Sequence, residues 1–252
     1  MIKLCTLNMT RLRQYISSVG AALALAGSPA WACGDSPPAD PGYRDATACQ
    51  WLELYGEEGL LFQVIRKNRQ VGEYRTQFIP TDDGLEVISS MELTIPILWV
   101  YDYQYRYTGR ELWRDGTLET LSVTVDDNGD SESFSLRRDG ERLTGEGPGG
   151  AVDLPLPVWA THHYDASITA QSVVFNTLTG RMNQVKVKQA GTEQVATAGN
   201  NRLATRYTYE GELHDTDAWY DQQGRWVKLR FKGSDGSTIE LHCVRCGGEV
   251  SS

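Results

Sequence analysis

Basic residues are scarce in this sequence. Its 252 residues include 24 lysines and arginines against 33 aspartates and glutamates, which gives a net charge of −9. General nucleic-acid binding and loose docking on anionic lipid both need a basic surface, so this charge excludes them. Long apolar runs are also missing downstream of the N-terminus, where the densest, residues 97–100, is soon followed by Asp102. Because spanning a bilayer takes about 20 apolar residues, we expect no transmembrane span in the mature chain.

Catalytic and metal-binding motifs are absent as well. The chain has four histidines, and it contains no G-x-S-x-G elbow and no H-E-x-x-H helix. One place looks catalytic: His162 and His163, with Asp165 nearby, would supply half of an acid–base pair. Adjacent residues of a strand face opposite ways, so at most one imidazole would point into a cleft. We predict no catalytic site, with these three residues as weak candidates, and neither a cofactor nor a metal site.

The first 32 residues have the three regions of a signal peptide. Lys3, Arg11 and Arg13 are basic, residues 15–27 are apolar, and residues 30–32 provide a small-x-small cleavage site. We therefore expect an exported protein of the periplasm or cell envelope, with residues 1–32 removed. The mature chain would keep 21 basic and 33 acidic side chains, a net charge of −12.

Four cysteines remain after this cleavage, and export makes disulfides plausible. The disulfide candidates are Cys33, Cys49, Cys243 and Cys246, which allow three pairings. Cys33 directly follows the cleavage site, so it is also a candidate for a lipid anchor. The C-x-x-C pair at 243–246 lies on the C-terminal tail rather than at a strand-to-helix turn, which argues against a thioredoxin-like role.

Alternating hydrophobicity dominates the mature chain. Val227, Leu229 and Phe231 alternate with basic residues, and residues 122–125, 133–137 and 185–188 show the same period of two. This pattern is typical of an antiparallel sheet with one buried and one solvated face. Asn-Gly and Asp-Gly pairs recur between the alternating segments and favour hairpin turns. The fold class is therefore mainly β: one strongly curved antiparallel sheet or open β-barrel of about 9–12 strands, with one or two short helices.

The domain boundaries follow from composition. We expect a signal peptide at 1–32, a flexible lead-in and short helix at 33–58, a β-rich domain at 59–246 and a tail at 247–252. The first helix is expected over residues 45–54, before two glycines, and residues 166–176 are the other place for a short helix. Residues 145–157, rich in glycine and proline, predict a long loop.

Five aromatic residues at a spacing of two form a row on one side of a predicted strand. They are Trp99, Tyr101, Tyr103, Tyr105 and Tyr107. The simpler interpretation is a core face, because aromatic residues are favoured in strands. The functional interpretation is the wall of a ligand cleft, since aromatic rings bury apolar ligands well. Five aromatics in one row are many for a small core, which keeps the ligand-binding interpretation open.

The block from Glu111 to Cys243 resembles a bacterial exported family, the domain-of-unknown-function family DUF6134. The matching segments are 111–116 with Leu118, 127–129, 159–162, Asn176 with 179–180, 206–207, 219–221, 226–227, 235–237 and Cys243; residues 62–74 resemble its opening hairpin. The pattern is also similar to periplasmic curved-sheet domains of the lipoprotein-carrier type. Such domains wrap a sheet partway round a helix and hold acyl chains in the gap. Fold analogy implies an apolar ligand but does not establish one.

Three functions remain open at this stage. The first is a non-enzymatic envelope protein whose aromatic-lined cleft binds a lipid-like or other apolar small molecule. The second is an interaction module that docks another envelope protein through a sheet edge or an aromatic patch. The third is a hydrolase that uses His162 or His163, for which the sequence offers no nucleophile motif.

Overall fold

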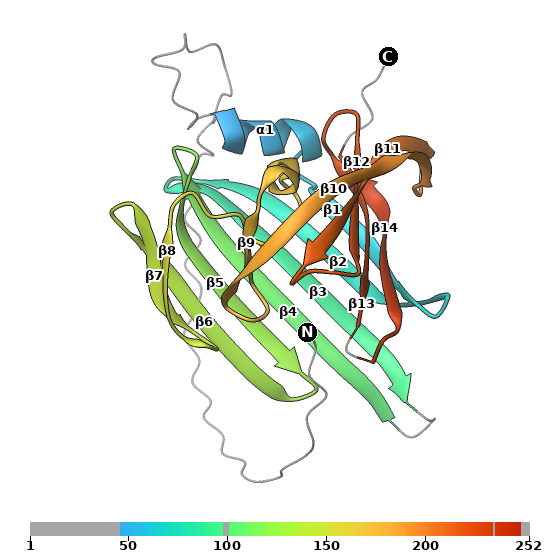
Figure 1. The fold of residues 1–252 in the computed structure, drawn as a ribbon, viewed down its shortest axis with the longest axis horizontal. Coiled ribbons are helices and arrows are strands. Elements are labelled where there is room, and N and C mark those ends of the chain that lie inside the picture. The colour runs from blue at the N-terminus through green and yellow to red at the C-terminus, as the bar shows by residue number, and fades with distance from the viewer. Residues whose placement is uncertain (1–45, 98–100, 234, 248–252) are drawn as a thin grey trace, which may run out of the picture.

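The fold is described from a computed structural model, which covers residues 46–97, 101–233 and 235–247 (Figure 1). The predicted signal peptide, Cys33 and Trp99 lie outside these residues. Helix α1 spans Ala46–Tyr55 and a short 3-10 helix, η1, spans Ala166–Ala170. The strands before η1 are β1 (Leu60–Arg66), β2 (Arg69–Thr81), β3 (Gly84–Ile97), β4 (Tyr101–Arg114), β5 (Thr117–Asp127), β6 (Asp130–Asp139), β7 (Arg142–Gly147) and β8 (Gly150–Pro155). The strands after it are β9 (Val173–Asn176), β10 (Arg181–Ala196), β11 (Asn201–Gly211), β12 (Thr216–Asp221), β13 (Trp226–Lys232) and β14 (Thr238–Cys246).

All of these strands form one antiparallel, 14-stranded sheet. Its order runs from β8 back to β1, then from β14 back to β9, so β1 and β14 join the two halves. Within the part of the chain that the structure describes, β8 and β9 are the two edges, and the sheet is not closed into a barrel. The predicted fold class, a single curved antiparallel sheet with short helices, is confirmed.

Tight turns connect most neighbouring strands, as the glycine-containing pairs predict. Between β4 and β5, Asp115 and Gly116 have φ angles of 49° and 65°. Between β5 and β6, Asn128 and Gly129 have φ angles of 56° and 99°, and Asp126 Oδ1 accepts a hydrogen bond from the Gly129 amide at 2.7 Å. Positive φ at both central positions matches the twist of the flanking strands, which is why Asn-Gly and Asp-Gly occur there.

One local prediction is wrong. Residues 145–157 are not a long loop, because β7 and β8 pair as a hairpin and Val152 and Leu154 are buried by alternation. The glycine and proline content there marks the turn at 148–149. The short helix predicted within residues 166–176 is present as η1, which ends at Ala170; β9 follows with Val173 and Val174, whose branched side chains favour strands. Together these strands raise the number to 14, above the expected 9–12.

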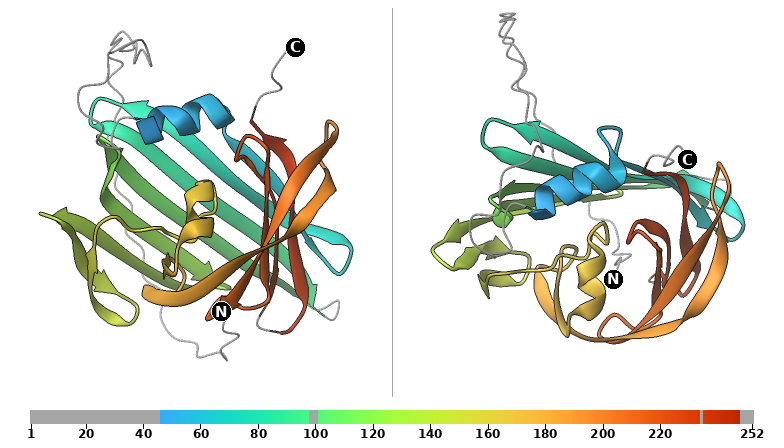
Figure 2. Two further views of the ribbon diagram at one scale, coloured as in Figure 1. Left: turned by 45° about the horizontal axis from the view of Figure 1, so that its top comes forward. Right: turned by 90° about the horizontal axis from the view of Figure 1, so that it is seen from above.

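The concave face of the sheet wraps around part of its own chain. Figure 2 shows η1 and the chain beside it enclosed by the curled sheet, with α1 lying across one end. From α1, the Trp51 ring packs edge-on against Trp113 of β4 and Tyr164, with ring centroids 5.0 and 4.8 Å away. Tyr55 stacks on Phe78 of β2 at 5.3 Å. The main core therefore lies between the concave face, α1 and the segment that precedes η1. In the described residues, no helix has the length and apolar character needed to cross a membrane.

Candidate functional site

A buried segment, residues 162–164, crosses the interior of the curved sheet without a strand partner. Its main-chain carbonyls instead accept hydrogen bonds from three tyrosine hydroxyls that come from different elements. Tyr74 of β2 donates to His162 O at 3.5 Å, Tyr220 of β12 to His163 O at 3.0 Å, and Tyr55 of α1 to Tyr164 O at 2.8 Å. A buried carbonyl without a partner is costly, so these three tyrosines, which we call the tyrosine clamp, fix the segment in place.

His162 uses both ring nitrogens inside this interior. Its Nδ1 is hydrogen-bonded to Oε1 of Glu111, and its Nε2 lies 2.5 Å from the Tyr107 hydroxyl. Tyr107 also donates to Thr177 Oγ1 at 3.0 Å, which extends the network to the loop after β9. Glu111 and His162 are 1% and 3% exposed, so in this structure no substrate reaches the imidazole.

Glu111 is the centre of this network. Besides His162, its carboxylate accepts a hydrogen bond from the Tyr164 hydroxyl and one from Trp113 Nε1, the latter at 2.7 Å. Burial raises the pKa of Glu111, but the attraction to His162 and the hydrogen bonds from His162, Tyr164 and Trp113 outweigh it, so the net pKa is lowered. Burial raises the pKa of the Tyr107 and Tyr164 hydroxyls well above 10, which keeps both phenols protonated as donors.

Gly109 provides the space for this arrangement. It lies between Tyr107 and Glu111 on the same face of β4. A Cβ atom at Gly109 would come within 2.7 Å of the Tyr107 hydroxyl and 2.8 Å of His162 Nε2. Only glycine therefore allows the imidazole to lie this close to the strand.

His163 points into a different part of the interior. Its ring lies between aromatic neighbours, with centroids 5.8 Å from Tyr209 and 5.6 Å from Trp226. Its backbone is in the left-handed region at φ 61°, which is uncommon for a residue other than glycine. Burial, and then the neighbouring His162, lower the pKa of His163 to about 3, so this imidazole is neutral at physiological pH. Its Nδ1 is buried without a hydrogen-bond partner.

Asp165, the third residue of the predicted catalytic spot, caps η1. Its carboxylate accepts a hydrogen bond from the Ser167 amide at 2.9 Å, the usual role of an N-cap aspartate. Burial is the main cause that raises the pKa of this carboxyl group, and the Ser167 hydrogen bonds oppose it. The predicted spot is thus divided: His162 joins Glu111, His163 faces other aromatic rings, and Asp165 stabilises a helix end.

The aromatic row of β4 divides in a similar way. Tyr103, Tyr105 and Tyr107 are buried, whereas Tyr101 is 49% exposed at the start of the strand. The Tyr103 hydroxyl donates to Asp127 Oδ1 at 2.5 Å, so it is anchored to β5. The three buried tyrosines contribute to the core, and the ligand-binding role of the row stays a prediction.

Half-buried apolar side chains lie on the same concave face in the C-terminal half of the sheet. Strand register places Val187 of β10 opposite Tyr209, and Tyr207 of β11 opposite Ala218. The Tyr207 ring meets that of Tyr220, whose hydroxyl is part of the tyrosine clamp, with centroids 6.0 Å apart. Val187 and Tyr207 keep partial exposure, as does Phe231 of β13. We call this surface the apolar face of β10–β13, with Val187, Tyr207 and Phe231 among its half-buried members. Partly buried apolar side chains also occur elsewhere on the sheet, for example Ile95 of β3 and Phe134 of β6.

One open cavity lies at an end of β1, β12, β13 and β14, and its volume is about 620 Å³. Its lining mixes the cations Lys67, Arg230 and Lys232 with the anions Asp215, Asp217 and Glu240, and it borders the apolar face of β10–β13 at Phe231. Two of these anions already have cationic partners: Asp217 binds Arg230 and Arg206, the latter at 2.9 Å, and Glu240 binds Lys228 at 3.1 Å. We assign this cavity no ligand.

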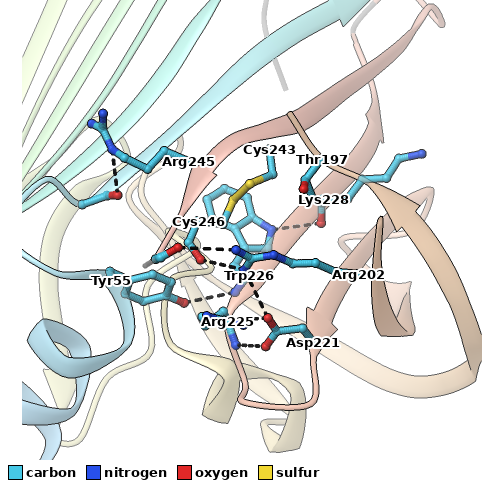
Figure 3. Close-up of a disulfide and its surroundings, with 12 residues drawn as sticks. Tyr55, Thr197, Arg202, Asp221, Arg225, Trp226, Lys228, Cys243, Arg245 and Cys246 are labelled. Atoms are coloured by element: carbon cyan, nitrogen blue, oxygen red, sulfur yellow. Dashed lines mark hydrogen bonds and ion pairs between the residues drawn. A yellow bond between two sulfur atoms is a disulfide. The ribbon is translucent and has the colours of Figure 1, made fainter. Parts of the chain in front are cut away.

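The structure resolves one disulfide, between Cys243 and Cys246 of β14 (Figure 3). In a regular strand, residues three apart face opposite sides at a distance of about 10 Å. Here the register with β1 shifts at Val244, and this bulge brings the two Cα atoms to 6.1 Å, within the range for a disulfide. Of the other candidates, Cys33 and the side chain of Cys49 lie outside the described residues.

Polar contacts hold the disulfide-bearing end of β14 against the rest of the sheet. The Cys246 carbonyl accepts a hydrogen bond from Arg202 of β11 at 3.0 Å, and Arg202 also reaches Asp221 at 3.3 Å (Figure 3). Asp221 in turn binds Arg225 at 2.7 Å. Cys243 is the register partner of Phe62 of β1, whose ring centroid is 4.3 Å from that of Trp226, so the disulfide borders the aromatic core.

Sequence reasoning missed Glu111 and the tyrosine clamp as members of the site. A signal for Glu111 exists: positions 103, 105, 107, 109, 111 and 113 share one face of β4, and a carboxylate on a buried face needs partners. No comparable signal exists for the clamp tyrosines, which come from three separate elements and meet only in the folded chain.

Comparison with known sequences now identifies the family. The profile described as "domain of unknown function (DUF6134)" matches residues 62–244. The chain belongs to the DUF6134 family. This match includes the network around Glu111 and His162 and strands β9–β13, so both lie inside the DUF6134 domain.

Solved structures show the same architecture. A β-barrel-like protein of the domain-of-unknown-function family DUF1849 from Brucella abortus superposes with a TM-score of 0.53 at 6% sequence identity. The similarity covers 76% of this DUF6134 chain and 97% of the other chain. At this identity the similarity concerns the fold alone. A comparison with curated protein sequences finds no match.

Proposed function

We propose that this DUF6134 protein is an exported binding protein of the cell envelope that holds a lipid-like or other apolar molecule on the concave face of β10–β13. The observation that carries the proposal is the half-buried apolar side chains on that face, Val187, Tyr207 and Phe231. Burial of apolar surface by a ligand contributes roughly 25 cal/mol per Å². A curved sheet with apolar side chains on its concave face is a frequent form of ligand site.

Export rests on the sequence of residues 1–32, with its basic start, apolar centre and small-x-small end. The Cys243–Cys246 disulfide is consistent with an oxidising compartment. Cys33 would be the first residue after cleavage, which keeps a lipid anchor as part of the proposal. The high negative charge favours apolar molecules or envelope proteins as partners rather than nucleic acid.

Catalysis at His162 has less support than binding. The imidazole is hydrogen-bonded to Glu111 on one side and to Tyr107 on the other, as in a proton relay. These three residues are nevertheless enclosed by the tyrosine clamp and α1. A general base must come within hydrogen-bond distance of the proton that it removes. The contacts of Glu111 explain the network as a structural one, because its carboxylate accepts from three buried donors.

The test of ligand binding uses protein purified from the exported fraction. Native mass spectrometry before and after solvent extraction should show an apolar adduct that extraction removes. Val187→Asp, which places a charge on the concave face, should lower adduct occupancy strongly. Ile79→Asp is the matched control, because Ile79 is an exposed residue at 36% that alternates with inward-facing Phe78 on β2. Protein with no adduct, which also takes up no added lipid, would contradict the proposal.

A second candidate is an interaction module, favoured by the open edge of the sheet at β8. In the described chain, β8 pairs with β7 on one side only, whereas the outer side of β9 is bridged to Ala160 through hydrogen bonds of Phe175 with Trp159 and Thr161. An edge strand offers unpaired amides and carbonyls to a strand of another protein. Crosslinking in intact cells should then recover a partner through residues such as Ala151 of β8, and recovery of free protein alone would count against this candidate.

A further inference from the structure

Three side-chain polar atoms in the described chain are buried without a hydrogen-bond partner: His163 Nδ1, the Tyr209 hydroxyl and Asn183 Oδ1. Two of them belong to rings that face each other, since the His163 and Tyr209 centroids are 5.8 Å apart at an interplanar angle of 84°. Buried polar groups are nearly always hydrogen-bonded, so two unpartnered groups on adjacent rings need an explanation. The interior elsewhere is well satisfied, as the three clamp tyrosines and Glu111 show.

These two groups lie next to the proposed ligand face. Tyr209 is the register partner of half-buried Val187 on the β10–β11 pair. The Tyr220 hydroxyl binds His163 O, and the Tyr220 ring packs against half-buried Tyr207. A molecule on the apolar face of β10–β13 would therefore border His163 and Tyr209. In this structure both atoms are enclosed, so neighbouring side chains have to shift before a ligand reaches them.

The surroundings of the pair select against a charged group. His163 is enclosed by the aromatic rings of Tyr209 and Trp226, and its low pKa of about 3 keeps the imidazole neutral. Burial raises the pKa of the Tyr209 hydroxyl and the nearby Tyr220 side chain opposes this shift, with the net result that the phenol stays protonated. A buried carboxylate needs a cation or several donors, whereas a neutral imidazole and a phenol suit a group that both donates and accepts.

Backbone geometry adds a second, independent indication. His163 has φ 61°, and a buried residue other than glycine in that region carries local strain. The clamp holds it there, because Tyr74 and Tyr220 bind the carbonyls of His162 and His163. The strained backbone keeps the imidazole turned toward Tyr209 rather than toward Glu111. Residues held in such conformations cluster at ligand sites.

We propose that His163 Nδ1 and the Tyr209 hydroxyl are the polar anchor of the ligand site, and that they hydrogen-bond an uncharged hydroxyl group of an otherwise apolar molecule. This inference rests on the proposed function and deepens it, because it names the head group of the ligand. It also gives the two unpartnered atoms a common partner.

The test compares two probes of equal chain length, 1-decanol and sodium decanoate, on the purified, solvent-extracted chain. Binding is followed by intrinsic fluorescence, since Trp226 lies 5.6 Å from the His163 ring. The variant is Tyr209→Phe, which removes one oxygen atom that has no partner. Tyr105→Phe on β4 is the matched control, a buried tyrosine outside the proposed ligand face. His163→Asn serves as a second variant, because Asn tolerates a left-handed backbone and keeps a polar atom near the position of Nδ1.

We expect 1-decanol to bind more tightly than decanoate. Tyr209→Phe should weaken 1-decanol binding by about tenfold, the loss expected for one hydrogen bond, and should leave decanoate binding nearly unchanged. Tyr105→Phe should change neither, and His163→Asn should retain part of the preference for 1-decanol. The melting temperature of unliganded Tyr209→Phe should equal or exceed that of the unmodified chain, because the lost hydroxyl had no partner.

Failure of the anchor and failure of the proposed function give different results. Equal binding of 1-decanol by Tyr209→Phe and by the unmodified chain would overturn the anchor while apolar binding stands. A lower melting temperature of unliganded Tyr209→Phe would also overturn it, since the hydroxyl would then have a partner such as an ordered water. If the unmodified chain binds neither probe, the proposed function itself is contradicted.

Discussion

Replacing Glu111 by Gln tests whether the buried network holds the interior together. The substitution keeps the shape of the side chain and removes the charge that three buried donors share: His162 Nδ1, Trp113 Nε1 and the Tyr164 hydroxyl. Glu111 and His162 form a buried ion pair, and removing the charge of one partner of such a pair costs about 3–5 kcal/mol. A domain of this size shifts its melting temperature by roughly 2–4 °C per kcal/mol, so we expect a decrease of about 6–20 °C.

The stability lost in Glu111→Gln should depend on pH in a definite direction. The pKa of Glu111 is lowered in the fold from its ordinary value of 4.5, so its stabilising contribution is complete above that value. The contribution is lost as pH falls through the lowered pKa of the folded state. The difference in unfolding free energy between the unmodified chain and Glu111→Gln should therefore be largest near neutral pH and shrink under acidic conditions.

Urea denaturation followed by tryptophan fluorescence measures both effects, because Trp51 and Trp113 pack beside the network. Glu86→Gln on β3 is the matched control: Glu86 pairs with exposed Arg110 at 3.1 Å, and such surface pairs contribute about 0–1 kcal/mol. A loss for Glu111→Gln as small as that of the control would refute the reasoning. A loss that stays constant with pH would show that the charge of Glu111 is not what matters.

Three further predictions concern the same interior. Gly109→Ala should destabilise the chain by about 1–3 kcal/mol in urea denaturation, because its Cβ would lie 2.8 Å from His162 Nε2; an unchanged midpoint would contradict the close approach. Tyr220→Phe should cost about 1–3 kcal/mol, since it leaves a buried main-chain carbonyl without its donor, and an unaltered melting temperature would mean that the clamp does not stabilise the segment. Cys243→Ser should lower the free energy of unfolding by about 2 kcal/mol, the loop-entropy value for so short a loop. In the unmodified chain, thiol labelling after unfolding without reductant should find neither Cys243 nor Cys246 free, and labelling of both would contradict the disulfide.

Much of the fold was predictable because its strands alternate apolar and polar residues and its turns use glycine-containing pairs. Val227, Leu229 and Phe231 alternate with basic residues in the sequence, and β13 runs from Trp226 to Lys232. The glycine-containing turns were equally visible, since Asp115-Gly116 and Asn128-Gly129 adopt the positive φ angles that such pairs favour. Local chemistry dictates both features, so one sequence is enough to find them.

The hairpin of β7 and β8 was not predictable by the same means. Its strands are short, and Gly145, Gly147 and Gly150 weaken the apolar alternation that marks longer strands. Pairing with β6 decides their state, and that is a tertiary effect. Strand β9 was not predictable either, because its four residues, close after η1, are too few to show a periodic pattern.

The site was only partly predictable. The sequence pointed to His162 and His163, but their roles depend on partners far along the chain, with Glu111 51 residues before His162. Long-range contacts such as Tyr55 with Tyr164, 109 residues apart, leave no local pattern. The C-x-x-C disulfide depends on a bulge at Val244 that only strand register reveals.

Hydrogen–deuterium exchange of the extracted protein, with and without 1-decanol, tests the central claim most directly. An apolar ligand on the concave face should slow amide exchange in β10–β13 and around His163, and should leave unchanged β5–β7, which do not pair with β10–β13 in the sheet. That pattern is the predicted result. Protection confined to the aromatic row of β4, or no protection at saturating 1-decanol, would contradict binding at β10–β13.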